Sequence, residues 1–153
     1  HVVGLCNEAG VVIDCAHATE ATTLGVIEAS EAPVMISHSH LDHADRSHPR
    51  LLSPVHALAV AEAGGLIGAW PSGVTSATFD DFVDEIERLV ELVGVDHVAI
   101  GTDLDANHRP VLTEHGEFAG VASGLADRGF SAAEVDAVLG GNGVALYRAV
   151  TGS

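Results

Sequence analysis

Short hydrophobic runs alternate with longer amphipathic stretches along this chain. Each run is three or four residues long and consists mainly of aliphatic residues. Runs of this kind are typical of short strands that are buried on both faces of a parallel sheet. The predicted strands are Val11–Asp14, Val34–Ile36, Leu66–Ala69 and Val98–Ile100.

The stretches between these runs have the spacing of amphipathic helices. The clearest one covers 79–93, where apolar residues recur at helical spacing after a capping-box pattern formed by Thr78 and Asp81, and Gly94 ends it. Other helices are predicted from about Thr19 to Ser30 with Ala21, Leu24 and Ile27 on one face, from Pro54 to Gly64-Gly65, after Ser131-x-x-Glu134, and from Gly140-Gly141-Asn142 through Arg148.

The alternation of strands and helices predicts an α/β fold with a parallel sheet. Neither GxGxxG nor GxxxxGK[ST] occurs in the sequence, so a nucleotide-binding domain is not expected. The other main α/β architecture is the (β/α)8 TIM barrel, which has about 250 residues. We therefore expect residues 1–153 to be one domain that is incomplete at its amino-terminal side and holds about four βα units of such a barrel.

The charge balance narrows the choice of partners. The chain has 22 Asp and Glu residues, six Arg and no Lys, which gives a formal charge of -16, and 47% of its residues are hydrophobic. This apolar content excludes a disordered chain, and the acidic balance argues against nucleic acid as a partner. The apolar runs are far shorter than the roughly 18 residues of a membrane span.

The cysteines and the first residues bear on the compartment. Cys6 and Cys15 are too few for a disulfide framework, so we expect reduced thiols. The segment begins at His1 without a signal-peptide pattern, so a cytoplasmic location is the default expectation.

Candidate catalytic chemistry lies at the ends of the predicted strands. His17 and His38 follow the first and second strands, and Asp103 follows the fourth. Ligands bind at the carboxyl ends of parallel strands, so we expect these side chains to converge. Imidazole and carboxylate groups are ligands of zinc, which activates water for hydrolysis of an amide or an ester.

A set of motifs in one order resembles the membrane dipeptidase family of renal-dipeptidase-like metallopeptidases. The motifs are GVVIDCAHAT, APVMISHSH, HPRLLSP, AEAGGLIGAW, VGVDHVAIGTDLDA and LGGNGVALYR. They cover essentially the whole chain, and the 21 residues from His17 to His38 agree with the spacing of the family's two late zinc-ligand histidines.

The resemblance implies a (β/α)8 barrel that holds two zinc ions and cleaves dipeptides. In it, His17 and His38 would ligate one zinc of the pair. Arg50, in the HPR motif, resembles the arginine that grips the substrate carboxylate, although Leu51 follows it where the family has Asn. Asp103 resembles the active-site aspartate that handles protons at the scissile amide and the free amino group of the substrate.

The same resemblance implies ligands that the 153 residues do not contain. These are a His-x-Asp on the first strand, a bridging Glu on a middle strand and another His that polarises the substrate carbonyl. We therefore expect the chain to be the carboxyl-terminal half of the enzyme and to lack a binuclear centre by itself. Because half a barrel exposes strand edges, we also expect it to aggregate or form a homodimer.

Two other functions stay open, as do the roles of several residues. The chain could belong to another amidohydrolase-type barrel metallohydrolase, or it could be a non-catalytic barrel fragment. We expect Cys15 to be buried, Asp14 to form hydrogen bonds and Asn142 to cap a helix. His40, His43 and His48 are expected at exposed loop positions, with substrate contact as an alternative for His40. Trp70 could line the pocket or pack in the core, and Asp105 could shape its loop or be solvated.

Overall fold

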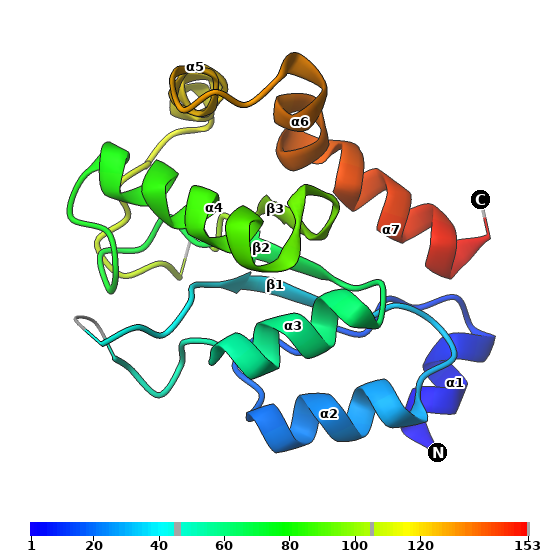
Figure 1. The fold of residues 1–153 in the computed structure, drawn as a ribbon. Helices are drawn as coiled ribbons and strands as arrows, with labels where there is room; N and C mark the ends of the chain where they lie inside the picture. Colours follow the sequence, from blue (N-terminus) through cyan, green and yellow to red (C-terminus); the bar gives the residue numbers. More distant parts are fainter. Residues whose placement is uncertain (45–46, 105, 153) are drawn as a thin grey trace.

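A parallel sheet of three strands lies at the centre of the structure (Figure 1). The computed structural model describes residues 1–44, 47–104 and 106–152. The strands are β1 (Met35–Ser39), β2 (Leu66–Ala69) and β3 (Val98–Ile100), in the order β1-β2-β3. The parallel α/β prediction is therefore confirmed for three of the four predicted strands, and β1 runs three residues further than predicted.

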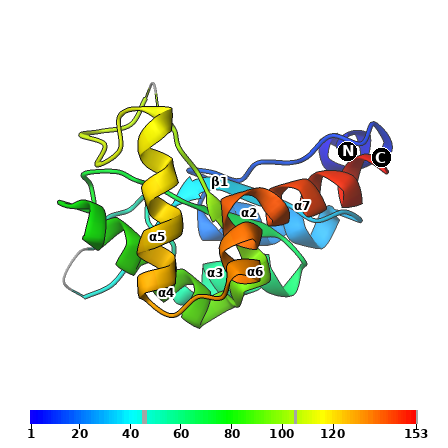
Figure 2. The same ribbon diagram turned by 90° about the horizontal axis from the view of Figure 1, so that it is seen from above.

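Helices cover the sheet and join its strands. They are α1 (Val2–Glu8), α2 (Glu20–Ala29), α3 (Pro54–Glu62), α4 (Phe79–Val93), α5 (Ala119–Asp127), α6 (Ala132–Asp136) and α7 (Asn142–Thr151), with short turns η1 (Val95–His97), η2 (His115–Phe118) and η3 (Ala137–Gly141). In the view of Figure 1, α2 and α3 lie below the sheet and α4 to α7 above it. Figure 2 shows both termini at the same end of the molecule, beside α7. The helices α1 and α5 were not predicted.

The first predicted strand, 11–14, is wrong as an element. Only Asp14 pairs with β1, in an isolated parallel bridge to Met35. The chain turns away directly afterwards, because the Asp14 carboxylate accepts the backbone N–H of Ala16 at 2.9 Å. The segment therefore runs beside β1 without becoming a regular strand.

Neighbouring residues of each strand belong to different parts of the core. Ile36, Ile67 and Val98 belong to the main cluster, which also contains the buried hydrophobic residues of α3 and α4. Their neighbours pack in a second cluster around Leu146 of α7. Strands buried on both faces read as continuous apolar runs, which explains why these three were recognisable in the sequence.

Two details of the predicted helices need correction. In α2 the buried residue is Thr23, whereas Ala21 and Leu24 are exposed, because the helix packs through a different face. Asn142 does not cap α7; its side-chain amide donates to the carbonyl oxygens of Val95 at 2.7 Å and Val98 at 2.8 Å. It thus ties the last helix to the start of β3.

None of the helices in the described part of the chain combines the length and the apolar character that a membrane span requires.

Candidate active site

Three predicted site residues meet at the carboxyl-terminal edge of the sheet. His17 lies in the turn after the isolated bridge, His38 is the penultimate residue of β1, and Asp103 is the third residue after β3. The parallel topology brings all three to one edge, as expected for strands that run in the same direction. The site is thus assembled from segments that are far apart in the sequence.

The two histidines point at each other. Their Nε2 atoms are 2.9 Å apart, and the ring centroids are 4.7 Å apart in an edge-on arrangement. The other ring nitrogen of His38, Nδ1, lies 2.9 Å from the hydroxyl oxygen of Ser37. Asp103 is next to them, with Oδ2 at 3.6 Å from the Nε2 of His38.

Asp14 holds the two histidine-bearing segments together. Its Oδ1 accepts the backbone N–H of Ala16 and the backbone N–H of Ser37, both at 2.9 Å. These are the residues directly before His17 and His38 in the chain. The hydrogen-bonding role considered for Asp14 is therefore seen in the structure, and it acts on the backbone that aims both imidazoles.

The histidines and Asp103 line a pocket of about 610 Å³. Its lining residues are His17, His38, His48, Arg50, Trp70, Val74, Asp103, Ala106 and His108. The structure thus brings Arg50 into the same pocket as the other three predicted residues. Trp70 is both buried and part of the pocket wall, which combines the two positions considered for it.

His108 is a pocket residue that the sequence reasoning missed. It lies in the segment after β3, and its carbonyl oxygen accepts the backbone N–H of Gly73 at 2.9 Å. This bond joins the segments that follow β2 and β3. The one indication in the sequence that His108 lines the pocket is its position after β3, because residues that follow a strand lie at the ligand-binding edge of a parallel sheet.

Burial and nearby charge favour neutral His17. Its pKa is lowered, first by desolvation and then by coulombic interactions with His38 and Arg50, while Asp103 and Asp14 act in the opposite direction. A neutral imidazole keeps a lone pair free, which is the form that binds a metal ion.

The remaining candidate residues differ in their burial. His40 is not an exposed loop residue; it is fully buried, and its Nε2 contacts the carbonyl oxygen of Trp70. His48 is exposed as predicted, and His43 is only partly exposed. Cys15 is buried in the core, as predicted, and its burial raises the pKa of the thiol. Asp105 lies outside the described residues.

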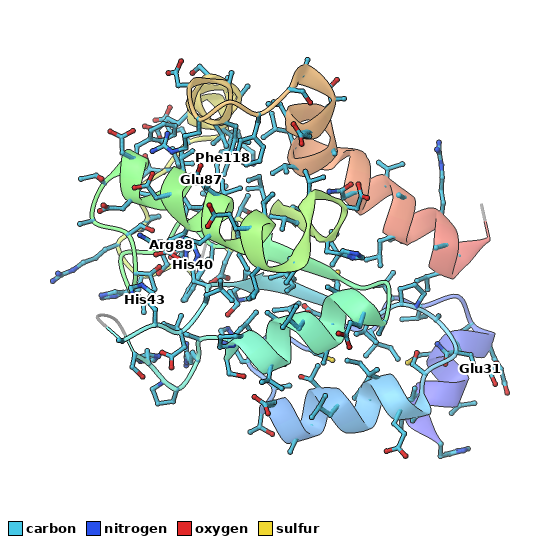
Figure 3. The ribbon with its side chains drawn as sticks, in the orientation of Figure 1. Glu31, His40, His43, Glu87, Arg88 and Phe118 are labelled. Carbon is cyan, nitrogen blue, oxygen red and sulfur yellow. The ribbon has the colours of Figure 1, made fainter. Side chains whose placement is uncertain are left out.

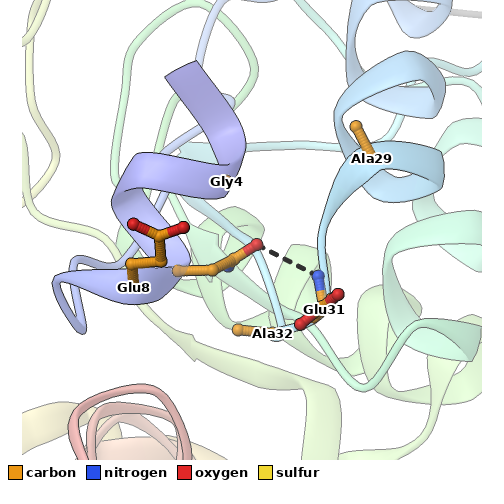
Figure 4. Close-up of a pocket in the computed structure, with 6 residues that line it drawn as sticks. Gly4, Glu8, Ala29, Glu31 and Ala32 are labelled. Carbon is orange, nitrogen blue, oxygen red and sulfur yellow. Dashed lines mark hydrogen bonds between the residues drawn. The ribbon is translucent and has the colours of Figure 1, made fainter. Parts of the chain in front are cut away.

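A second pocket, of about 350 Å³, lies between α1 and the end of α2 (Figure 4). The side chain of Asn7 accepts the backbone N–H of Glu31 there at 3.1 Å. The ionisable groups that line it are the carboxylates of Glu8 and Glu31. Its lining residues include no histidine or arginine, unlike those of the histidine pocket.

The histidine pair fits a zinc ion as part of a ligand set. The described residues hold no group of three or more His, Cys, Asp or Glu side chains arranged to hold a metal. However, the Nε2 atoms of His17 and His38 converge on one point, and imidazole nitrogens are preferred zinc ligands. A zinc site takes three or four protein ligands, so further ligands are needed.

Comparison with known proteins identifies relatives of the chain. The family described as membrane dipeptidase, peptidase family M19, matches residues 1–152. Dipeptidase aclJ of Aspergillus oryzae is 30% identical over 150 residues, which cover 92% of this chain and 35% of that protein.

Solved structures share the fold. An amidohydrolase from Pseudomonas aeruginosa matches with a TM-score of 0.87 at 27% identity, over 99% of this chain and 56% of that one. A metallopeptidase from Rhodobacter sphaeroides was solved with a phosphinate mimic of the dipeptide L-Ala-D-Ala. It matches with a TM-score of 0.87 at 21% identity, over 97% of this chain and 45% of that one. The chain therefore spans about half the length of these solved relatives and about a third of the fungal one.

Proposed function

Because the chain belongs to the membrane dipeptidase family, peptidase family M19, we propose that it is the carboxyl-terminal half of a zinc-dependent dipeptidase. The observation that carries the proposal is the meeting of the His17 and His38 Nε2 atoms, 2.9 Å apart, in a pocket that also holds Arg50 and Asp103. In the full-length protein the chain would supply about four βα units of a single (β/α)8 barrel domain.

The metal-binding part of the proposal concerns the two histidines. His17 and His38 would hold one zinc ion of a two-zinc centre, with the other ligands supplied elsewhere in the full-length protein. Bound zinc supplies a Lewis acid that polarises the scissile amide and activates water near neutral pH. The bonds from Asp14 to the backbone hold both imidazoles in place for this role.

The remaining pocket residues suit a dipeptide that carries a charge at each end. The planar guanidinium of Arg50 can donate two parallel hydrogen bonds to the terminal carboxylate. The carboxylate of Asp103 can bind the free amino group and accept a proton at the reacting amide. A longer peptide cannot place both termini within one pocket, so the arrangement favours dipeptides over longer peptides.

Removing either histidine tests the metal assignment. In the full-length protein, we expect His17→Ala and His38→Ala each to lower the zinc content per chain and to reduce dipeptide turnover by roughly 100-fold or more, because a ligand is lost. Metal content is measured by plasma emission spectroscopy, and turnover with L-Ala-D-Ala. His115→Ala, which removes an exposed histidine outside the pocket, is the matched control. Full zinc content and activity in both pocket variants would refute the assignment.

A substrate panel separates the proposed dipeptidase from the alternatives. One solved relative is described as an amidohydrolase, so N-acyl amino acids and cyclic amides are assayed beside dipeptides. A dipeptidase should prefer the dipeptides. Good turnover of the cyclic amides without dipeptide cleavage would favour another barrel metallohydrolase, and no turnover of any compound by the zinc-loaded protein would favour a non-catalytic role.

A further inference from the structure

A carboxylate lies on α4 where the helix otherwise packs in the core. Glu85 lies on the buried face of α4 together with Phe82, Ile86 and Leu89, and its side chain is 1% exposed. Removing a charge from water is strongly unfavourable unless the charge is paired. A buried carboxylate on an apolar helix face therefore requires a structural or functional reason.

Two basic side chains meet Glu85 from different parts of the fold. Arg88, one turn further along α4, has its Nη1 at 2.5 Å from Oε1 of Glu85. His43 reaches the same oxygen from the segment after β1, with its Nε2 at 3.6 Å. Figure 3 shows His43 and Arg88 on the side of α4 that faces this segment. Glu85 thus connects the helix to a segment that is otherwise part of the pocket region.

That segment, residues 41–44 and 47–52, is called the Arg50 loop below. Its base is closed by a parallel bridge between Leu41 and Leu52. Within it, the Asp42 carboxylate accepts the backbone N–H of His48 at 3.1 Å. The backbone N–H of Arg50 in turn donates to Nδ1 of His48 at 3.2 Å.

The ion-pair contact between Glu85 and His43 and the hydrogen bonds of the loop form a continuous series from α4 to the pocket. Glu85 contacts His43, the adjacent residue Asp42 holds His48, and His48 holds the backbone of Arg50. Both His48 and Arg50 line the histidine pocket. The base of the loop packs in the core through Leu41 and Leu52, and the Ser39 hydroxyl donates to the Arg50 carbonyl oxygen at 3.2 Å. The contact between His43 and Glu85 adds an anchor on a helix to these.

We propose that Glu85 is a positioning residue, which holds the Arg50 loop through His43 so that the Arg50 guanidinium meets the substrate carboxylate. This inference rests on the dipeptidase function proposed above. A helix is a more rigid support than a loop, and binding groups must be held to within a fraction of an ångström to be effective. An apolar residue at position 85 would fill the same space without directing the loop.

A double-mutant cycle in the full-length, zinc-loaded protein tests the proposal. With L-Ala-D-Ala as substrate, we expect Glu85→Gln to raise KM about tenfold with kcat changed less than about twofold, because the carboxylate contact is weakened rather than the chemistry. In an Arg50→Ala background the same change should alter KM by less than about twofold. Glu87→Gln, on the same helix and outside this series of contacts, is the matched control.

A variant on the loop side and a second measurement keep the test independent of folding and of the reaction. His43→Ala removes the partner of Glu85 from a partly exposed position and should reproduce the rise in KM. Hydrogen exchange of the backbone at 47–52 should become faster in both variants than in the Glu87→Gln control. An equal KM penalty with and without Arg50, or unchanged exchange at 47–52, would overturn the proposal. If the wild-type protein cleaves no dipeptide, the proposed function fails, and hydrogen exchange alone decides whether Glu85 positions the loop.

Discussion

His17 and Asp103 have φ angles of 61° and 44°, in the left-handed region that residues other than glycine rarely adopt. Such a backbone costs on the order of 1–3 kcal/mol and persists only where neighbouring contacts impose it. Here the Asp14 carboxylate fixes the turn before His17, and the carbonyl oxygen of Asp103 accepts the N–H of Ala106 at 3.1 Å. Both strained residues line the histidine pocket. In proteins, backbone strain of this kind is concentrated at active sites and binding sites.

Two glycines allow His38 to take its place. A Cβ at Gly101 would lie 2.8 Å from Cα and 2.9 Å from Cβ of His38, and a Cβ at Gly68 would lie 2.8 Å from the carbonyl carbon of Ser37. Non-bonded carbon atoms do not approach so closely. The absence of side chains at Gly68 and Gly101 therefore lets the end of β1 pack against both positions.

Gly101→Ala is expected to displace His38. In the full-length protein it should reduce zinc content and lower kcat/KM by roughly 10- to 100-fold, because ligand positions must hold to within a fraction of an ångström. Zinc analysis and steady-state kinetics measure the effect, and circular dichroism shows whether the variant folds. Gly25→Ala, in an open position on α2, is the matched control and should leave zinc and activity unchanged. A folded Gly101→Ala protein with full zinc content would contradict this role.

Among the elements, α4 has the most complete local signals. Thr78 and Asp81 cap its first turn reciprocally, with the Asp81 N–H donating to the Thr78 hydroxyl at 3.1 Å and the Thr78 N–H to the Asp81 carboxylate at 3.0 Å. Gly94 ends the helix with a φ of 87°. The same helix carries Glu85, which contacts His43 of the Arg50 loop. The capped first turn therefore stabilises the helix on which this loop contact depends.

Thr78→Ala should destabilise the protein by about 1 kcal/mol, because the first turn of α4 loses its cap and the backbone N–H of Asp81 loses its acceptor. The free energy of unfolding is measured by urea denaturation followed by circular dichroism. Thr78→Ser keeps the hydroxyl and should recover most of the loss. Equal stability of the alanine and serine variants would show that the cap does not contribute.

At the scale of the whole molecule, the described chain has an open sheet edge and exposed apolar side chains. In the described sheet β3 pairs only with β2, and several large apolar side chains are exposed. Three of these, Leu139, Val144 and Tyr147, lie at or near α7. Unpaired strand edges and exposed apolar side chains favour association with another chain.

The isolated 153-residue chain is therefore expected to form homodimers or aggregates. Sedimentation velocity over a wide range of concentrations should show mass increasing with concentration. Val144→Glu together with Tyr147→Glu should reduce this association. The control Thr22→Glu, which adds a negative charge at an exposed polar position, should not. A monomer at every concentration, with a sharp and reversible unfolding transition, would contradict the expectation.

The sequence by itself determined the three strands β1 to β3, most of the helices, and the convergence of His17, His38 and Asp103 at one edge of the sheet, because local spacing and parallel topology suffice for all of these. It also supported Arg50 through a motif. Tertiary structure decided that 11–14 pairs only at Asp14 and that His40 is buried. It also decided that His108 lines the pocket and that Glu85 reaches the Arg50 loop. These features depend on contacts between residues that are distant in the chain, and no local pattern encodes which distant segments meet.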